Sequence, residues 1–427
     1  MRSNDLRELF GSTSFALLLL VAGPLTGMSF IAALHAYAEA SGGMALASAL
    51  SPLDGVLVPS LGAYDLLITF LVPFVAIHLI ASEKSSGANV LLLQSPLRLR
   101  AQLASKLTAL LLGWVVCLVP AMLALVLWRT YGGHLAAGET LNVLLGHTLR
   151  YMVTCAIAIA AAAVFEGAAS AAIVVLSFTI GTWALDFFAT GRGGWIAAVA
   201  QYTPSAMLRK FERGLVPFDS IAASLIATLL LLWIAAVFLD LRAKSRALRV
   251  AIALVIAVVA FFVIPRDRSI DVSEDRRSSF SSADEQLLRC IEAPVMIRVH
   301  LAAEDPRAND YERNVLTKLR RTLSDLRVEY PYAGRTALFE NDEQYGTIVY
   351  RIGRKETVSR STTEEIVLDE LETLAGLTPP HRGEGVYPGY PLNAPARGAA
   401  TLFYVVWPLL IGACFLVSRR RLPHVSS

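Results

Sequence analysis

The sequence has few charged residues. Only 17% of its 427 residues are Asp, Glu, Lys or Arg, whereas a soluble globular protein carries about 25%. The mean hydropathy of +0.54 is correspondingly high. These values exclude an ordinary cytosolic enzyme and predict that lipid surrounds much of the chain.

Cysteines and nucleotide-binding motifs are also scarce. Three of the four cysteines, Cys117, Cys155 and Cys414, lie in apolar runs, and Cys290 stands alone in a polar stretch. This distribution does not support a disulfide framework, redox chemistry or a thiolate metal site. No G-x-x-x-x-G-K-[ST] phosphate loop occurs. We therefore expect no enzymatic activity, no metal and no cofactor in this chain, and ATP hydrolysis would have to come from a partner.

The charges that are present are concentrated in one segment. Residues 266–397 contain 42 charged side chains in 132 positions, or 32%, and the other 295 residues contain 31, or about 11%. A chain with two such compositions is expected to occupy two environments. The polar segment is therefore predicted to be a water-soluble domain within a membrane-embedded protein.

Eight apolar runs are long enough to cross a bilayer as helices, which takes about 20 residues. They cover 14–34, 64–82, 107–128, 143–165, 168–188, 221–241, 248–265 and 399–417. The fourth and fifth are separated only by Glu166 and Gly167, which predicts a tight helical hairpin. The first precedes a signal-like Ala36-Tyr37-Ala38 sequence, but its length favours an uncleaved anchor.

Lys and Arg in the short loops indicate the orientation of the spans. With a cytoplasmic N-terminus, the cytoplasmic side collects thirteen: Arg2, Arg7, Lys84, Arg98, Arg100, Lys106, Arg242, Lys244, Arg246, Arg249, Arg419, Arg420 and Arg421. The opposite side collects Arg129, Arg192, Arg209, Lys210 and Arg213. This bias predicts a multi-pass membrane protein with both termini cytoplasmic and residues 266–397 extracytoplasmic.

Three charged residues fall near the predicted outer ends of spans, namely Asp65, Arg150 and Asp186. Snorkelling to the lipid headgroups accounts for side chains at such positions. The alternative is that Arg150 and Asp186, on adjacent spans, pair within the membrane and line a path.

The loop between the second and third spans carries the most specific pattern. A charged pair, a glycine, a leucine-rich helix, Ser95-Pro96, a basic patch and a lysine follow one another. This order resembles the coupling loop of type 2 ABC exporter permeases, which inserts into a cleft on a separate ATPase. The resemblance implies an ATPase-coupling role for Glu83, Lys84, Gly87, Leu92, Pro96, Arg98 and Lys106. Ala88 stands where that family usually has threonine.

The N-terminus resembles the same family. Residues 4–12 are similar to the amphipathic interfacial helix that precedes the first span in these permeases, with Leu6, Leu9 and Phe10 on one side and Arg7 and Glu8 on the other. Residues 202–219 also resemble the family, and Arg209, Lys210 and Arg213 would then lie on a short amphipathic helix at the outer surface. The alternative is that these basic residues form a solvated face.

The polar segment predicts a small α/β domain, thioredoxin-like but without a redox pair. Strands are expected at 295–301, 336–339 and 347–352, and amphipathic helices at 309–326 and 363–375. Its opening, Asp271-Val272-Ser273-Glu274-Asp275-Arg276, resembles the N-terminal part of the auxiliary component of gliding-motility-type ABC transporters.

The chain is thus divided into a six-span ABC permease domain (1–247) with its coupling loop at 83–106, a seventh span (248–265), an extracytoplasmic α/β auxiliary-like domain and linker (266–397), and an eighth span with a basic tail (398–427). The resemblance implies a non-hydrolytic permease subunit of an ABC exporter in the bacterial cytoplasmic (inner) membrane. It would form the translocation path as a homodimer or heterodimer of permeases and bind a cytoplasmic ABC ATPase that carries the ATP.

An extracytoplasmic partner for residues 266–397 is also implied, whereas nucleic acid is not expected. The alternative function is a membrane-anchored sensor or assembly scaffold that displays the extracytoplasmic domain. An ion-coupled carrier fits less well, because the sequence shows neither a convincing inverted repeat nor much charge at midplane.

Overall fold

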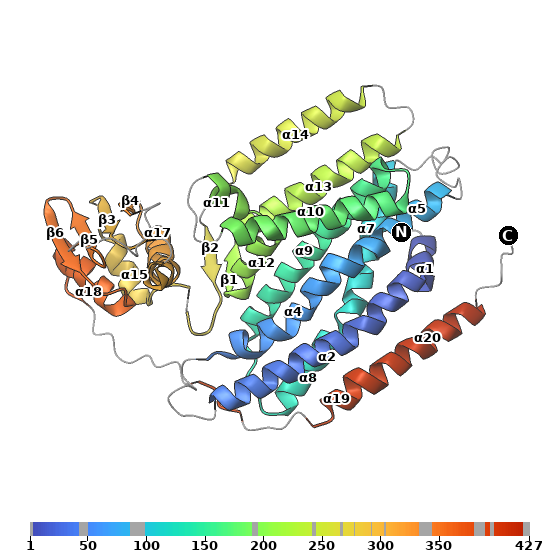
Figure 1. Ribbon diagram of the computed structural model, residues 1–427, viewed down its shortest axis with the longest axis horizontal. Coiled ribbons are helices and arrows are strands. Elements are labelled where there is room, and N and C mark those ends of the chain that lie inside the picture. Colours follow the sequence, from blue (N-terminus) through green and yellow to red (C-terminus); the bar gives the residue numbers. More distant parts are fainter. Residues whose placement is uncertain are drawn as a thin grey trace.

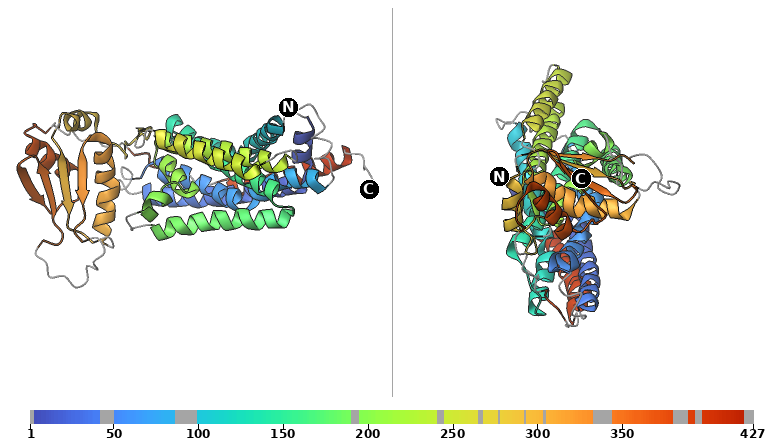
Figure 2. Two further views of the ribbon diagram at one scale, coloured as in Figure 1. Left: turned by 90° about the horizontal axis from the view of Figure 1, so that it is seen from above. Right: turned by 90° about the vertical axis from the view of Figure 1, so that its left-hand side faces the viewer.

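The computed structural model describes residues 3–41, 50–85, 99–189, 195–240, 245–264, 268–276, 278–291, 293–302, 305–332, 344–379, 389–392 and 397–421. A bundle of long helices forms most of the molecule, and a small α/β domain extends from one end of it (Figure 1). Both chain termini lie at the opposite end of the bundle. A second view shows the long axes of most bundle helices directed toward the domain (Figure 2).

Eight helices in the described residues are long and apolar enough to span a membrane, as the sequence predicts. They are α2 (Thr13–Ser41), η1 to α5 (Leu53–Lys84), α7 with α8 (Ala101–Thr130), α9 (Ala137–Val164), α10 (Ala168–Ala189), α13 (Phe218–Leu239), α14 (Arg246–Val263), and α19 to α20 (Ala399–Ser418). The protein is therefore a mostly helical multi-pass membrane protein with a small mixed β-sheet region.

The second span is longer than the sequence indicates. It begins at Leu53 instead of Tyr64 and passes through two π-helical turns, Leu53–Leu57 and Leu67–Leu71. Leu53, Val56 and Leu57 are buried in the bundle. This packing keeps the segment helical although it contains Asp54 and Gly55, which favour a turn in isolation.

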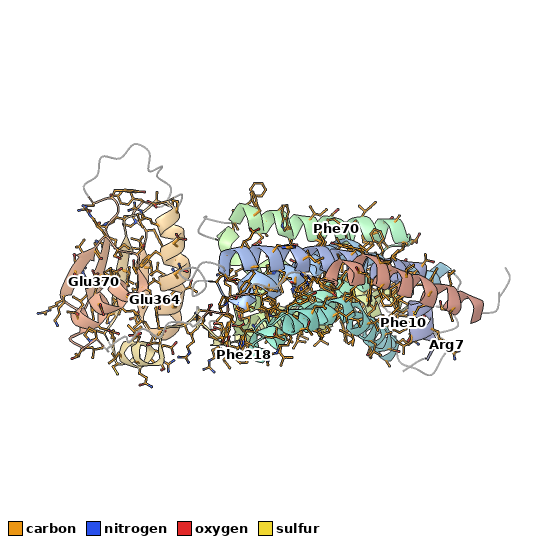
Figure 3. The ribbon with its side chains drawn as sticks, turned by 90° about the horizontal axis from the view of Figure 1, so that it is seen from below. Arg7, Phe10, Phe70, Phe218, Glu364 and Glu370 are labelled. Carbon is orange, nitrogen blue, oxygen red and sulfur yellow. The ribbon has the colours of Figure 1, made fainter. Side chains whose placement is uncertain are left out.

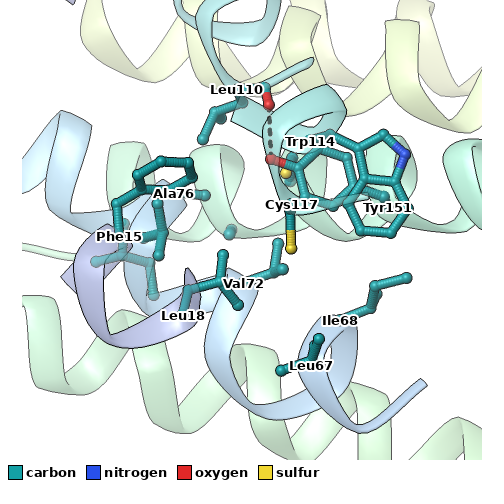
Figure 4. Packing of buried hydrophobic residues seen from close by; sticks show 14 of the residues in the cluster. Phe15, Leu18, Leu67, Ile68, Val72, Ala76, Leu110, Trp114, Cys117 and Tyr151 are labelled. Atoms are coloured by element: carbon teal, nitrogen blue, oxygen red, sulfur yellow. Dashed lines mark hydrogen bonds between the residues drawn. The ribbon is translucent and has the colours of Figure 1, made fainter. Parts of the chain in front are cut away.

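Helix α9 is the centre of the bundle. It packs against α5, α7, α10, α13 and the short helix α12 (Pro204–Glu212). Its second half contains buried alanines, and such small residues let neighbouring helices approach closely. Trp114 of α7 stacks on Tyr151 of α9 with ring centroids 4.5 Å apart, and the Tyr151 hydroxyl donates to the Leu110 carbonyl at 2.8 Å (Figure 4).

The last span is held against the first by two glycines. On α2, Gly23 faces the Trp407 ring and Gly27 faces Phe403, so closely that a Cβ atom at either glycine would overlap these side chains. Trp407 Nε1 also donates to the Leu19 carbonyl at 2.7 Å. The contact thus joins the two ends of the sequence, as the neighbouring ribbons of α2, α19 and α20 show (Figure 1).

The α/β domain contains a four-stranded sheet with the order β4–β3–β5–β6. Its elements are α15 (Ser282–Arg289), β3 (Val295–Val299), α16 (Pro306–Tyr311), η3 (Glu312–Leu316), α17 (Thr317–Thr322), β4 (Leu326–Glu329), β5 (Ile348–Ile352), β6 (Lys355–Ser359) and α18 (Glu364–Ala375). Strands β3 and β4 are parallel, and the other two pairs are antiparallel. Alternate residues of β3 and β5 share one apolar core with the helices.

The observed elements of this domain differ in several places from those expected from the sequence. The helix expected over 309–326 ends at Thr322, because Leu326 begins β4 beside β3. Strand β6 was not expected, since its sequence is mostly polar and exposed. On α18, Leu368 is buried against the core, whereas Ile366 is 45% exposed. The strand expected at 336–339 lies outside the described residues.

A two-stranded sheet joins the bundle to the domain. Strand β1 (Leu215–Pro217), which precedes α13, pairs antiparallel with β2 (Ser269–Asp271), which follows α14. The pairing continues beyond β2, because the Val272 amide donates to the Gly214 carbonyl, just before β1, at 2.8 Å. Gly214 has φ +75°, and a Cβ atom there would contact Ser273 at 2.6 Å. Residues 269–273 of the polar segment therefore lie against the bundle.

The Asp-Val-Ser-Glu-Asp sequence has a structural explanation at this junction. The Asp271 carboxylate accepts hydrogen bonds from the Ser273 amide at 2.9 Å and from the Ser279 hydroxyl at 2.6 Å. The Glu274 amide donates to Glu139 of α9 at 2.7 Å, and the Glu274 carboxylate pairs with His134 at 2.8 Å. These bonds fold the segment into a turn and fasten it to the bundle.

Candidate functional site

The candidate site is the base of the loop that joins α5 to α7. Glu83 stands in the last turn of α5 (Val72–Ser85), and Lys106 in the first half of α7 (Leu99–Cys117). The Lys106 Nζ lies 2.8 Å from Glu83 Oε1 and donates to the Leu79 carbonyl at 2.8 Å. The two side chains are 5% and 17% exposed, so the pair is largely shielded from solvent. We call Glu83, Lys84, Lys106 and the residues bonded to them the loop base.

The N-terminal helix α1 (Ser3–Gly11) contributes carboxylates to the loop base. Asp5 accepts a hydrogen bond from the Ser105 hydroxyl at 2.6 Å and lies 3.9 Å from the Lys106 ammonium. Glu8 accepts a hydrogen bond from Ser82. The helix thus contacts both ends of the loop, and its position at the termini-bearing end of the bundle is visible in Figure 3 through Arg7 and Phe10.

The faces of α1 differ from the expectation in one residue. Leu9 is fully buried, whereas Phe10, expected beside it on the apolar side, is 41% exposed and forms an edge contact with Phe15. Buried Asp5 lies on the inward side instead. A polar residue is stable there because Ser105 and Lys106 provide its partners.

Lys84 links the loop base to the central helix. Its ammonium donates to the carbonyls of Ala162, Ala163 and Phe165, at 2.8, 3.1 and 2.8 Å. These are carbonyls at the C-terminus of α9, which have no partner within the helix and carry the negative end of its dipole. Lys84 therefore caps α9 at the hairpin between α9 and α10.

The loop base connects four helices at one point. Glu83 and Lys84 belong to α5, Lys106 to α7, and their partners to α1 and α9. Charged and hydrogen-bonded contacts therefore fix the ends of the loop to these four helices. Gly87, Leu92, Pro96 and Arg98 lie outside the described residues.

The intramembrane pair proposed from the sequence is not the pair that forms. Arg150 binds Asp65 of α4 (Val58–Leu66) at 3.1 Å, and Asp186 forms a bidentate pair with Arg209 of α12 at 2.5 Å. Arg150 lies about 21 Å and Asp186 about 27 Å from the α9–α10 hairpin along their helices, at 1.5 Å per residue. This offset places each residue beside a different partner.

Helix α12 is not a free surface helix. Thr203 caps its N-terminus by accepting a hydrogen bond from the Ala206 amide at 3.2 Å, as expected for a Thr-Pro start. Met207, Leu208 and Phe211 are buried. The amphipathic pattern correctly indicated a helix, but its basic residues bind acidic residues of neighbouring spans instead of lying free at the surface: Arg209 binds Asp186, and Lys210 binds Asp219 at 2.8 Å.

A buried histidine adjoins the Asp65–Arg150 pair. His147 of α9 is fully buried, and its Nδ1 lies 3.8 Å from Asp65 Oδ1. Neither ring nitrogen has a hydrogen-bond partner among the described residues. The same residues contain no group of three or more His, Cys, Asp or Glu side chains that could hold a metal ion.

Sequence reasoning missed the acidic partners of Lys106 and Arg150. Asp65 was expected at the headgroup region, and Asp5 was not singled out. Asp5 instead lies beside Lys106 of α7, and Asp65 binds Arg150 of α9. Residues far apart in the sequence contribute to each group, so only helix packing identifies them. Comparison of this chain with protein-family models, curated proteins and solved structures found no match.

Proposed function

We propose that this chain is the membrane-spanning permease subunit of an ABC-type exporter. In this proposal a separate cytoplasmic ATPase binds the loop at 83–106, and the chain forms the translocation path. The observation that carries the proposal is the loop base, where the Glu83–Lys106 pair and the Lys84 cap join the loop to four helices. A loop anchored in this way is suited to pass the movement of a bound motor to the spans.

The arrangement of the chain supports a cytoplasmic location for the loop. The termini lie at the same end of the bundle, opposite the α/β domain (Figure 1). The loop base is at the termini-bearing end, because α1 is part of it. The sequence assigns thirteen of eighteen loop Lys and Arg residues to the side that carries the N-terminus, and such residues accumulate on the cytoplasmic side. The α/β domain is then extracytoplasmic.

The strand arrangement supports a thioredoxin-like fold for the domain. Parallel β3 and β4 are joined by a helix, and β5 and β6 follow as an antiparallel hairpin on the other side of β3. Cys290, the cysteine of this segment, is exposed and free. The domain would therefore serve in binding instead of redox chemistry, as an auxiliary domain of the transporter.

The outer faces of the bundle leave room for a second permease. No residue of the most apolar window of α14 is buried, and only 17% of the corresponding window of α10 is. On α10, Trp183 and Phe187 are 62% and 70% exposed. Lipid covers such faces in a monomer, and a homodimer or heterodimer would cover part of them.

Copurification tests the proposed motor. The tagged full chain would be coexpressed with candidate ATPases that contain a phosphate loop, beginning with one encoded next to it, and purified from membranes. Replacing residues 86–98 by a Gly-Ser linker of equal length should abolish ATPase recovery without lowering the melting temperature. Arg351→Gln, in an exposed pair with Glu356 on the α/β domain, is the matched control. Recovery of an ATPase at the wild-type level with the replaced loop would refute the proposal.

Transmission can be separated from binding at the loop base. The double variant E83Q/K106M keeps residues 86–98 and should therefore still recover the ATPase. It lacks the pair that joins α5 to α7, so transport-linked ATP hydrolysis should fall. A scaffold that only displays the α/β domain would retain its function in both the loop replacement and this variant.

A further inference from the structure

A basic cavity lies at the junction between the bundle and the α/β domain. Its volume is about 510 Å³, and residues from β2, the turn that follows it, α15 and α17 form its walls. Phe218, the first residue of the α13 span, also lines it. Figure 3 shows Phe218 at the end of the bundle that faces the domain. The cavity therefore lies where a spanning helix meets the membrane surface.

Positive charge predominates in this cavity. Five basic residues line it, against two acidic ones: Arg268, Arg276, Arg289, Lys318 and Arg321, with Asp271 and Glu285. Two of the basic residues have partners, since Arg289 pairs with Glu285 at 3.2 Å and Lys318 with Glu364 at 2.7 Å.

The remaining carboxylate in the cavity is already engaged. Asp271 accepts hydrogen bonds from the amides of Ser273 and Ser278 and from the hydroxyls of Ser273 and Ser279. These bonds fold the turn that carries Arg276. Arg268, Arg276 and Arg321 also line this cavity. None of the three forms an ion pair with a residue that the structure describes.

Arg321 is the least exposed of these three arginines. It is partly buried, and among the described residues its guanidinium donates to neutral oxygens, the Ser269 hydroxyl at 3.2 Å and the Thr317 carbonyl at 3.4 Å. Burial lowers the pKa of this guanidinium, and the nearby Asp271 and Glu285 offset only part of the effect. A shielded cation whose charge is only partly compensated is costly, so an anion in the cavity would stabilise it.

We propose that this cavity binds a phosphate group. One carboxylate ligand has two oxygens and matches a single guanidinium, whereas a phosphate offers enough oxygens for several. The cavity is larger than a phosphate ion, and exposed Phe218 and Ile270 on its wall provide apolar surface beside the charges. An anionic lipid headgroup and free inorganic phosphate share this chemistry.

A bound phosphate would fasten the domain to the membrane part of the protein. Arg321 belongs to α17 of the α/β domain, whereas Arg268 precedes β2, which pairs with β1 of the bundle. An anion that contacts both would connect the domain to the bundle in addition to the β1–β2 pairing. This inference does not depend on the proposed export function.

Thermal unfolding of the detergent-purified full chain tests the proposal with three probes. They are dioctanoyl phosphatidylglycerol, dioctanoylglycerol, which has the same acyl chains without phosphate, and inorganic phosphate. We expect the phospholipid to raise the melting temperature by several degrees, because a ligand that binds only the folded state stabilises it. Dioctanoylglycerol should not do so. A matching rise with inorganic phosphate would identify free phosphate as a source, and its absence would identify the lipid headgroup.

Variants decide whether the effect arises in this cavity. Arg321→Gln and Arg268→Gln should each remove at least half of the phosphate-dependent shift, and Arg351→Gln, on the exposed side of the sheet, should leave it unchanged. Arg268 is exposed, so its variant should fold normally even if Arg321→Gln does not. Equal shifts in wild type and both cavity variants, equal shifts with dioctanoylglycerol, or no shift with any probe would overturn the proposal.

Discussion

The Lys106 ammonium and the Glu83 carboxylate form a 2.8 Å ion pair that closes the base of the loop between two membrane-spanning helices. Lys106 is also bound to the Leu79 carbonyl and lies 3.9 Å from Asp5. One cation therefore offsets two carboxylates in a place with little access to water. The loop ends are fixed by charge as well as by helix packing.

Removing either member of this pair should have unequal effects. Lys106→Met leaves the Glu83 and Asp5 carboxylates uncompensated and should lower the free energy of unfolding by about 3 kcal/mol. Glu83→Gln leaves Lys106 its other partners and should cost about 1 kcal/mol. Unfolding of the purified variants in detergent measures both, and a larger loss in Glu83→Gln would contradict the assignment of Lys106 as the central residue.

The Lys84 cap should stabilise the end of α9 locally. Lys84→Met removes the donor to three carbonyls, and we expect a loss of about 1 kcal/mol together with faster amide hydrogen exchange near the α9–α10 hairpin. Lys84→Arg, which keeps the charge, should retain most of the protection. Unchanged exchange in Lys84→Met would show that the cap contributes nothing.

Double-mutant cycles can distinguish the observed ion pairs from the one suggested by the sequence. Asp65→Asn with Arg150→Gln should show a coupling of about 1 kcal/mol, because these side chains touch. Arg150→Gln with Asp186→Asn should be additive within about 0.5 kcal/mol. Strong coupling in the second cycle, measured by unfolding in detergent, would restore the pairing across the α9–α10 hairpin.

The close approach of α2 and α20 should make Gly27 intolerant of a side chain. Gly27→Ala forces the new methyl group into Phe403 and should cost about 1–3 kcal/mol. Gly412→Ala on α20 is a matched control, because a Cβ atom there meets no other atom within 4 Å, and it should be neutral or stabilising. Equal melting temperatures for the two variants would show that α20 is not packed in this way.

Glu212 at the end of α12 should make stability depend on pH. Burial and the nearby Asp65 carboxylate raise its pKa to about 7, although Arg150, Arg209 and Arg213 oppose the shift. The folded state then binds this proton more tightly than the unfolded state, so its contribution is present at low pH and is lost as the pH rises through 7. Glu212→Gln should therefore melt several degrees above wild type at pH 8 and match it at pH 4, below the ordinary pKa of about 4.5.

Hydropathy and charge distribution were sufficient to predict the eight spans and the separate polar domain. Burial of backbone groups in lipid requires long apolar helices, and this requirement is visible in any window of about 20 residues. The short hairpin at Glu166 and Gly167 followed from the same pattern. Within the α/β domain, the strongly apolar strands β3 and β5 were predicted and polar β6 was not.

The sequence by itself therefore determined which segments form helices long and apolar enough to span a membrane and which segment forms the polar α/β domain, since both depend on local composition. Tertiary structure alone decided that Asp65 pairs with Arg150, that Asp186 pairs with Arg209, and that Asp5 reaches Lys106. Partners in such pairs come from helices distant in sequence, and their meeting depends on helix rotation and axial offset. The charge of each residue is known from the sequence, but its partner depends on how the helices pack.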